Sequence, residues 1–523
     1  MILLINPPVV KPCEPPAGIA ALAGSLQRFG AACVLLDANL EGLLYLLTLR
    51  NTAEDTWTKR AYRHLDRHAR VLRSWRGYEN PDRYRRAVYD INRVLASSAG
   101  RQGVRLTLAD YQDSRYAPVR SRDLVKAAEE PEKNVFYPYF RERISGLLDR
   151  IQPKLIGISL NYLSQAVCAF ALIGFVRKQY PDAKIILGGG LVTSWMHRPG
   201  WKNPFDGLID LLVAGPGEQA LLSLAGIDSD ATAACLPAYE LLPTSDYLAP
   251  GLILPYSASR GCYWNKCSFC PERAEGNPYR PLHSDQVVAG MQSMAAYFKP
   301  VLIHLVDNAL SPALLKALSS SSVRTPWYGF ARITPQLKDK EYCNSLRAAG
   351  CVMIKLGVES GDQAVLDSLQ KGVSCEDASQ ALHSLTSSGI ATYVYLLFGT
   401  PAETEPAARR TLDFVVSHGD CISFLNLALF NMPLYGPEAA SMATRTFSEG
   451  DLSLYADFVH PAGWSRPLVR DFLDKEFKRH HLKFSSAAKS TEIKKIFDEY
   501  GLNSMEDLLV AVGYGKISPK YVV

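Results

Sequence analysis

The strongest constraint on the fold is an alternation of short β-rich runs with helical segments, which occurs in two separate series along the chain. The first series predicts strands at 1–6, 32–37, 155–160, 184–187 and 209–213. The second predicts strands at 252–258, 301–306, 327–330, 352–358, 392–397 and 422–427. Apolar strands separated by helices favour parallel sheets with helices packed on them. A chain of 523 residues is also too long for one ordinary core, so we expect at least two α/β domains.

The two series define the expected domain boundaries. Residues 1–225 predict a doubly wound, Rossmann-like domain, interrupted at about 50–135 by an insertion rich in Arg, Tyr, Trp and His. We predict that this insertion is mainly helical, because a structureless loop of that length would be unusual. Its arginines fit either a solvated helical face or a surface that grips an anion. A linker rich in Ala, Ser, Asp and Pro follows at 226–250, and then a (β/α)6 partial TIM barrel at 251–435. Residues 436–523 hold no cysteine and are predicted to be mainly helical.

Bulk properties exclude several classes of protein. The formal net charge of +5 is too small to indicate a nucleic-acid binder by itself. The apolar run at 1–6 has no basic residues before it and ends at Pro7 and Pro8, which favours a buried strand over a signal peptide. No stretch of about 18 uninterrupted apolar residues predicts a membrane span. Eleven cysteines without a secretory signal suggest a reducing cytoplasm, where cysteines are ligands or buried small residues.

Three of these cysteines form a compact motif directly after the first strand of the second series. Cys262, Cys267 and Cys270 lie within nine residues, and Gly261 precedes them at a point where the backbone must turn tightly. Thiolates are the usual protein ligands of iron–sulfur clusters. Three thiolates leave one iron of a four-iron cluster open for another ligand, as catalytic metals keep one position open. The loop also lies where barrel enzymes place their chemistry, at the carboxyl end of a strand.

A zinc site is the alternative interpretation of this loop. A histidine such as His283 could then supply the fourth ligand. However, zinc sites normally show paired ligand couples at short spacing, and no second CxxC or HxxxH follows downstream.

The segment from about 250 to 430 resembles the radical S-adenosylmethionine (SAM) superfamily. Its spacing is C-x4-C-x2-C, whereas the family usually has C-x3-C-x2-C, so the first arc is one residue longer. Four further matches follow in order along the chain: the aromatic before the third cysteine, an Arg after the third strand, a Glu-Ser-Gly at the end of the next strand, and a Gly-Thr-Pro-Ala-Glu-Thr turn. The resemblance implies that SAM is bound by Phe269, Arg332, Glu359, Ser360, Gly399 and Pro401.

The chemistry implied by this resemblance is radical initiation. In the family, the open iron of a [4Fe–4S] cluster chelates SAM, and an electron from the cluster cleaves SAM to a 5′-deoxyadenosyl radical that abstracts hydrogen. The protein contributes positioning, electronic tuning and exclusion of water. An external electron donor such as a flavodoxin or ferredoxin is implied as a partner.

The domain ahead of the barrel resembles the cobalamin-binding (B12-binding) domain of cobalamin-dependent radical SAM enzymes, including the class B methyltransferases. Such domains can carry D-x-H-x-x-G, and this chain has Asp37-Ala-Asn39-Leu-Glu-Gly42, in which Asn39 replaces the histidine. The resemblance implies base-off cobalamin without a histidine ligand to cobalt, since a carboxamide is a poor cobalt ligand beside imidazole. The cobalamin contacts implied by this resemblance are Pro7, Asp37, Asn39, Gly42, Ser159, Gly188, Gly189, Gly190, Gly215, Gly217 and Glu218.

Three hypotheses for the function follow. The first is a cobalamin-dependent radical SAM methyltransferase that methylates an unactivated carbon of a small molecule or peptide. The second is a non-methylating rearrangement, cyclisation or heteroatom exchange that uses the same cofactors. The third is a zinc-stabilised binding protein whose basic, aromatic insertion docks RNA or a peptide. We expect a cytoplasmic enzyme with no membrane association and no nucleic-acid partner, and no motif in the sequence selects its substrate.

Overall fold

The computed structural model describes residues 1–49, 55–100, 103–228, 235–446 and 450–478. The chain divides into two compact units, each considered by itself below. The first unit comprises Met1–Ile253 and Ser448–Leu454, and the second comprises Leu254–Phe447 and Tyr455–Val523. No helix among the described residues is long and apolar enough to cross a membrane.

The first unit is built on a parallel sheet of five strands in the order β2-β1-β5-β6-β7. Its strands are β1 (Ile2–Asn6), β2 (Cys33–Asp37), β5 (Leu155–Ser159), β6 (Lys184–Gly188) and β7 (Leu211–Leu212). All five strands predicted for the first series are therefore present. Counted within this sheet, the order is 2-1-3-4-5, which is the order of a doubly wound flavodoxin-like domain. Such a sheet has its topological switch point between β1 and β5.

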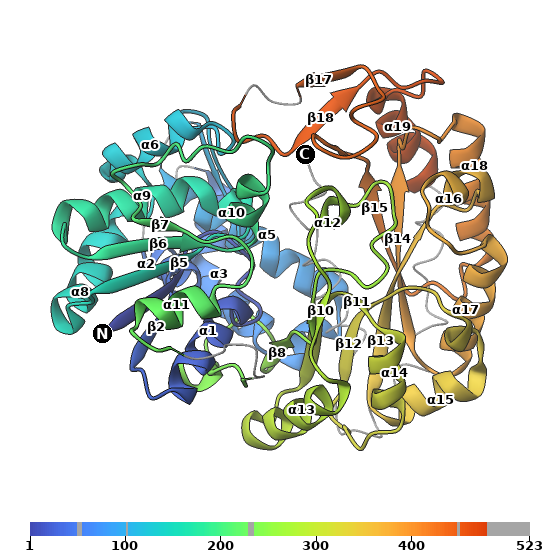
Figure 1. Ribbon diagram of the computed structural model, residues 1–523, viewed down its shortest axis with the longest axis horizontal. Helices are drawn as coiled ribbons and strands as arrows, with labels where there is room; N and C mark the ends of the chain where they lie inside the picture. Colours follow the sequence, from blue (N-terminus) through green and yellow to red (C-terminus); the bar gives the residue numbers. More distant parts are fainter. Residues whose placement is uncertain (50–54, 101–102, 229–234, 447–449, 479–523) are drawn as a thin grey trace. The chain divides into compact units, whose positions relative to one another are not determined.

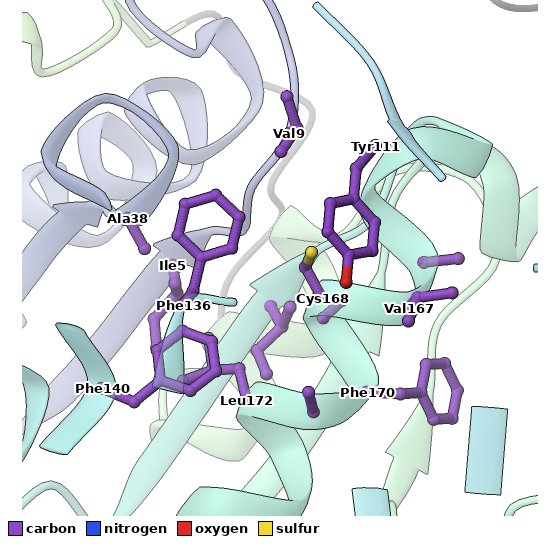
Figure 2. Close-up of a cluster of buried hydrophobic side chains, with 14 of the residues drawn as sticks. Ile5, Val9, Ala38, Tyr111, Phe136, Phe140, Val167, Cys168, Phe170 and Leu172 are labelled. Atoms are coloured by element: carbon purple, nitrogen blue, oxygen red, sulfur yellow. The ribbon is translucent and has the colours of Figure 1, made fainter. Parts of the chain in front are cut away.

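Helices cover both faces of this sheet (Figure 1). The helix α1 lies with α11 on one face, and α9 lies on the other. The helices that follow the strands are α1 (Ala17–Arg28), α2 (Ala38–Thr48), α9 (Leu163–Gln179), α10 (Gly190–Met196) and α11 (Glu218–Leu224). The helix α9 is buried on all sides from Ser164 to Val176. Figure 2 shows Cys168, Phe170 and Leu172 of this helix within the hydrophobic core.

The insertion is mainly helical, as predicted, and it also contains a β-hairpin. Its elements are α3 (Thr56–Leu72), α4 (Trp75–Tyr78), α5 (Pro81–Ala99), β3 (Val104–Leu106), β4 (Tyr111–Asp113), α6 (Ser121–Glu129) and η1 (Pro131–Lys133). The helices α3 and α5 pack on each other, and their buried residues belong to the same core as the sheet. The short helices α7 (Tyr137–Tyr139), η2 (Phe140–Ile144) and α8 (Ser145–Ile151) then lead to β5. The insertion is thus an integral part of the first unit.

The segment predicted to be a linker packs against the rest of the first unit over residues 235–250. It contains a short helix, η3 (Tyr239–Leu241), and the Ala238 N–H donates to the carbonyl of Ala20 over 2.9 Å. The Tyr247 hydroxyl donates to Asp37 Oδ2 over 2.8 Å. These buried contacts explain why a composition typical of a linker does not produce one here.

The second unit is built on six strands whose order in the sheet follows their order in the sequence, β15-β14-β13-β12-β11-β8. They are β8 (Ile253–Tyr256), β11 (Leu302–Leu310), β12 (Trp327–Ala331), β13 (Cys351–Glu359), β14 (Ala391–Phe398) and β15 (Phe424–Leu429). All six predicted strands are present, and β11 to β15 pair in parallel. The helices between them are α13 (Ser284–Phe298), α14 (Pro312–Ser319), η4 (Pro335–Lys338), α15 (Lys340–Ala348), α16 (Gln363–Ser368), α17 (Cys375–Ser387) and α18 (Glu405–Ser417). This sequential order is that of a partial (β/α)6 barrel.

The region after β15 differs from the helical prediction where it is described. It forms a small sheet of three antiparallel strands, β16 (Met432–Pro433), β17 (Thr444–Thr446) and β18 (Tyr455–Phe458). Only α19 (Arg466–Phe472) and η5 (Leu473–Phe477) are helical there. Backbone pairing with Met432 and Pro433 holds residues 455–458 extended, and such a tertiary contact is not visible in local sequence. The rest of the predicted helical region, 479–523, lies outside the described residues.

Candidate functional site

The cysteine loop of the second unit begins at β9 (Ser259–Arg260), which pairs with β10 (Arg280–Pro281). Asp307 anchors this point, because it accepts hydrogen bonds from the Ser259 hydroxyl over 2.6 Å and from the Ala258 N–H over 3.0 Å. Gly261 then turns with a φ of 70°, and a Cβ at that position would lie 2.5 Å from the carbonyl oxygen of Pro278. Only glycine fits this turn. The loop therefore starts from a rigid base.

The protein environment shifts the pKa of two of the three thiols, through burial and through nearby charges and N–H groups. Cys270 precedes α12 (Pro271–Ala274), and the N–H groups of Glu272 and Arg273 lower its pKa, although burial raises that pKa overall to about 11. Cys267 is buried, which raises its pKa, while the cations of Lys371 and Arg332 act in the opposite direction. Both thiols are therefore protonated at neutral pH until a metal displaces the protons.

A single-ion site needs its ligand side chains close to one point. Within the described ranges, no three His, Cys, Asp or Glu side chains are arranged to hold one metal ion. A four-iron cluster gives each thiolate a different iron, so its three cysteines do not have to converge on one point. His283, considered above as a fourth zinc ligand, has a side chain that is 72% exposed and lies 3.7 Å from Asp285. The zinc alternative has no geometric support among these residues.

The additional residue in the first arc has a defined place. Asn265 adopts a φ of 44°, which gives the arc a left-handed turn. Trp264 then lies against the turn that follows α16, and its indole N–H donates to the Gln370 carbonyl over 3.2 Å. A Cβ on Gly372 would come within 2.4 Å of the Trp264 ring, so this approach requires the glycine.

Arg332, predicted to contact SAM, follows β12 and is buried. Its Nη1 donates to Cys267 Sγ over 3.6 Å, and its Nη2 donates to the carbonyl of Lys371. The guanidinium carbon lies 4.0 Å from the centre of the Trp264 ring. Arg332 thus lies beside a predicted cluster ligand, while its contact with SAM stays a prediction.

Glu359 ends β13 and forms a buried ion pair with Lys371. The distance from Lys371 Nζ to Glu359 Oε1 is 2.7 Å, and the two side chains are only 6% and 10% exposed. Glu359 has a φ of 66°, an uncommon conformation for a side chain of this size. The Lys371 ammonium also lies 5.7 Å from the centre of the Phe269 ring. Sequence reasoning missed Lys371, because it belongs to no recognisable motif and reaches the site only through the turn after α16.

The remaining predicted SAM residues lie nearby in the sequence order expected of them. Phe269 packs against two small apolar clusters, one around Leu369 and the other around Phe430. Ser360 is fully buried, and its hydroxyl lies 3.0 Å from that of Thr411. Gly399 has a φ of 76° and, with the half-buried Pro401, forms the turn after β14. The Ser360 hydroxyl is thus engaged within the protein, and the contacts of these residues with SAM stay predictions.

The turn after β14 also contains a buried acid. Glu403 Oε2 accepts hydrogen bonds from the Gly399 N–H over 2.5 Å and from Trp464 Nε1 over 3.0 Å. Burial raises the pKa of Glu403 to about 7. This carboxyl fixes the shape of the Gly399 turn.

In the first unit, the motif that resembles D-x-H-x-x-G is buried. Asp37 caps α2 and accepts hydrogen bonds from Asn6 Nδ2 over 2.9 Å and from Leu40 N, while burial raises its pKa. Asn39 is 1% exposed, and its Oδ1 accepts from the Val10 N–H over 2.8 Å. A Cβ on Gly42 would lie 3.1 Å from the Phe136 ring. These residues have structural contacts within the protein, and any contact with cobalamin stays a prediction.

The loops after β5 and β6 meet at the carboxyl end of the same sheet. Asn161 links them, because its Nδ2 donates to Ser159 Oγ over 3.1 Å and its Oδ1 accepts from the Gly190 N–H over 2.9 Å. Gly189 has a φ of 109°, and a Cβ there would lie 2.4 Å from the Leu160 carbonyl oxygen. Gly188 ends β6 and is half-buried.

The loop after β7 joins this group through Thr193, whose Oγ1 accepts from the Gly215 N–H over 2.9 Å. Gly215 is exposed, while Gly217 and Glu218 are half-buried at the start of α11. Pro7, after β1, is buried, and its carbonyl accepts from Gln165 Nε2 over 2.8 Å. The predicted residues of this unit thus form two groups: glycine loops, partly exposed, at the strand ends, and buried residues that brace them.

Comparisons with known proteins agree with the geometry of the second unit. Residues 256–415 match the Radical SAM superfamily. Residues 470–523, most of them outside the described part, match the RelA/SpoT AH domain. The chain is 25% identical to the hopanoid C-3 methylase of Methylococcus capsulatus over 352 residues, which cover 60% of this chain and 65% of that protein. The curated relatives that it matches are each covered over less than two thirds of their length.

Two solved structures share the fold of both units. The radical SAM methyltransferase TsrM from Kitasatospora setae, with tryptophan and a SAM analogue bound, matches with a TM-score of 0.54 at 17% identity, covering 94% of this chain and 90% of that one. The cobalamin-dependent SAM radical enzyme OxsB, with aqua-cobalamin bound, matches with a TM-score of 0.55 at 14% identity, covering 99% and 73%. At these identities the likeness shows a common fold. The cysteine loop, its position in the sheet and the family match together identify residues 256–415 as a Radical SAM domain.

Proposed function

We propose that this chain is a cobalamin-dependent radical SAM enzyme that methylates an unactivated carbon. The observation that carries the proposal is the cysteine loop directly after the first strand of the six-stranded sheet, inside the segment that matches the superfamily. Cys262, Cys267 and Cys270 would hold a [4Fe–4S] cluster. Bound there, the cluster supplies the electron that cleaves SAM to a 5′-deoxyadenosyl radical, and cobalamin supplies a carrier for the methyl group.

The residues of the second unit have distinct tasks in this proposal. Asp307 and Gly261 hold the cysteine loop on the sheet, and Arg332 donates to the thiolate of Cys267. Glu359 is placed by its pair with Lys371 and offers its second carboxylate oxygen to a cation or hydroxyl of SAM. Positioning of this kind is the contribution of the protein to cofactor chemistry.

The first unit supports cobalamin through its topology and its loops. The sheet order places the switch point between β1 and β5, which is where ligands of doubly wound domains lie. Asn161 and Thr193 tie the loops after β5, β6 and β7 together at the carboxyl end of the sheet. The buried Asn39 is engaged with Val10 N, which supports binding without a lower ligand from this position. OxsB, which shares the fold, is described with bound aqua-cobalamin.

Cobalamin binding is tested on protein reconstituted with hydroxocobalamin and freed of excess cofactor. A corrin absorption spectrum at one cobalt per chain is the expected result. Protein that retains no corrin would overturn the cobalamin part of the proposal.

The type of reaction is tested by the products formed from SAM. Holoenzyme with cluster and cobalamin, a chemical reductant and SAM labelled with deuterium in its methyl group is expected to form S-adenosylhomocysteine and 5′-deoxyadenosine. A non-methylating rearrangement, cyclisation or heteroatom exchange with the same cofactors is the second candidate. It would give 5′-deoxyadenosine without S-adenosylhomocysteine, and that result would contradict methyl transfer.

A further inference from the structure

We propose that Arg332 sets the reduction potential of the iron–sulfur cluster through its hydrogen bond to Cys267, and that Trp264 positions Arg332 for this task. The inference rests on the proposed function, because it concerns the cluster that the three cysteines would hold. It assigns a role to Trp264, which is the second residue after Cys262 in the lengthened C-x4-C arc. Neither residue has to touch the substrate.

The guanidinium of Arg332 is buried, and the charge that compensates for it must come from its immediate contacts. Its side chain is buried, with the residue 6% exposed, and it contacts a thiol, a carbonyl and an aromatic ring. Among the described residues no carboxylate lies within 4.0 Å of its guanidinium. A buried charge is costly unless an opposite charge compensates for it. The thiolate of Cys267, as a cluster ligand, supplies that opposite charge at the end of the 3.6 Å hydrogen bond.

Trp264 supplies the geometry. Its ring lies under the guanidinium plane, with 4.0 Å between ring centre and guanidinium carbon, and stacking of this kind restricts where Arg can point. The ring is itself fixed by the bond to the Gln370 carbonyl and by close contact with Gly372. The same turn binds the cysteine loop again, because the Ser268 N–H donates to the Leu369 carbonyl over 3.1 Å. The arc between Cys262 and Cys267, the turn after α16 and Arg332 are therefore linked by direct contacts.

The electrostatic consequence has a definite sign. Each electron that enters the cluster adds negative charge beside the guanidinium, so Arg332 stabilises the reduced state. Hydrogen bonds to sulfur and local net charge are recognised determinants of cluster potentials. The ammonium of Lys371 is also close, but Glu359 lies 2.7 Å from it and offsets its charge. Arg332 is the cation that bonds directly to Cys267, and its loss makes the cluster harder to reduce.

The experiment is a redox titration of this chain, reconstituted anaerobically with iron and sulfide and followed by the electron paramagnetic resonance (EPR) signal of the reduced cluster. For Arg332→Gln we expect a drop of about tenfold in the ratio of reduced to oxidised cluster at a fixed potential, which is about 59 mV for a one-electron couple. Arg332→Lys keeps the positive charge but loses the planar guanidinium, and Trp264→Ala removes the indole ring on which the guanidinium lies. Each is expected to lower the ratio of reduced to oxidised cluster about threefold.

Two variants serve as controls. Trp264→Phe keeps a ring under the guanidinium, and Lys266→Gln removes an exposed cation whose Nζ lies 4.8 Å from the Trp264 ring centre. We expect both to stay within about twofold of the wild type, because exposed charges are screened. The control with Lys266 separates a specific bond from a general change of charge.

Iron and sulfide are counted before each titration. Arg332→Gln with a full cluster and an unchanged potential would overturn the inference. If that variant holds no cluster, an unchanged potential in both Arg332→Lys and Trp264→Ala would overturn it equally. A wild-type protein without a [4Fe–4S] cluster would instead overturn the proposed function, so the two failures are distinguishable.

Discussion

The two units place their chemistry-bearing residues at the carboxyl ends of parallel strands, but they use these residues differently. In the second unit the motif residues contact one another, since Arg332 donates to Cys267, and Glu359 pairs with Lys371. In the first unit the matching motif is turned inward, where Asp37 caps α2 and Asn39 holds the backbone at Val10. The predicted residues that stay partly exposed in this unit are mainly the glycines of the loops after β6 and β7.

The difference concerns what kind of ligand each end can hold. The second unit offers thiols and charged side chains, which bind a metal cluster and a charged cofactor through strong directional contacts. The first unit offers glycine backbone and small polar side chains, which allow a large flat ligand to approach closely. Variants that break one unit should therefore leave the other intact.

The largest expected effect is the loss of a cluster ligand. Cys267→Ala should remove the cluster and lower the rate of SAM cleavage by at least three orders of magnitude, because the chemistry depends on the metal. Iron content and 5′-deoxyadenosine formation measure it. Cys375→Ala is the matched control, since Cys375 begins α17 in the same unit and is half-buried, and it should keep full iron content. Equal iron in the two variants would contradict the assignment, and cobalamin retention should be the same in both.

The next effect concerns the buried ion pair. Lys371→Met leaves Glu359 buried without its cation, and removal of one partner from such a pair costs roughly 3–5 kcal/mol. Denaturant unfolding of the second unit measures the change. Lys475→Met is the control, because Lys475 and Asp471 form an exposed i,i+4 pair with side chains 67% and 63% exposed. That loss should cost about 0.5 kcal/mol or less, and similar costs for the two variants would refute a structural role of the buried pair.

The stability of the second unit should depend on pH, because among the described residues the buried Glu403 is hydrogen-bonded only by the neutral donors Gly399 N–H and Trp464 Nε1. The pKa of Glu403 is about 7, above its ordinary value of 4.5, so the folded state holds this proton more tightly than the unfolded state does. The stability of the second unit should therefore fall as pH rises from about 4.5 to about 7, by up to roughly 3 kcal/mol.

Thermal unfolding of Glu403→Gln tests this effect. An amide does not ionise, so the unfolding temperature of the variant should be nearly independent of pH in that window. A decline as steep as in the wild type would mean that another group is responsible.

The smallest change in stability is expected for a glycine in the loop after β6 of the first unit. Gly189→Ala forces a Cβ to within 2.4 Å of the Leu160 carbonyl oxygen at a φ of 109°, which we expect to cost about 1–3 kcal/mol and to weaken cobalamin retention. Gly146→Ala is the control, because it lies in α8 with nothing within 4 Å of an added Cβ. That change should be neutral or stabilising by up to about 1 kcal/mol. Iron content should be unchanged in both variants, and a loss of iron in Gly189→Ala would contradict the independence of the two units.

Sequence patterns predicted the strands of both sheets, because buried parallel strands are read directly from apolar runs. They also predicted the cysteine loop and Glu359, which lie in motifs at strand ends. The patterns did not reveal Lys371 or the contact of Trp264 with Arg332, since both depend on the turn after α16 folding back onto the loop. The structural use of Asn39 was likewise invisible, because its partner at Val10 lies on another loop.

We propose that Cys262, Cys267 and Cys270 hold a [4Fe–4S] cluster with one iron open to SAM. Iron and sulfide analysis of anaerobically reconstituted protein, followed by EPR of the reduced state with and without SAM, tests it most directly. We expect about four irons and four sulfides per chain and an EPR signal whose g-values change when SAM is added. Protein that contains one zinc and no sulfide, or a cluster whose spectrum does not respond to SAM, would contradict it.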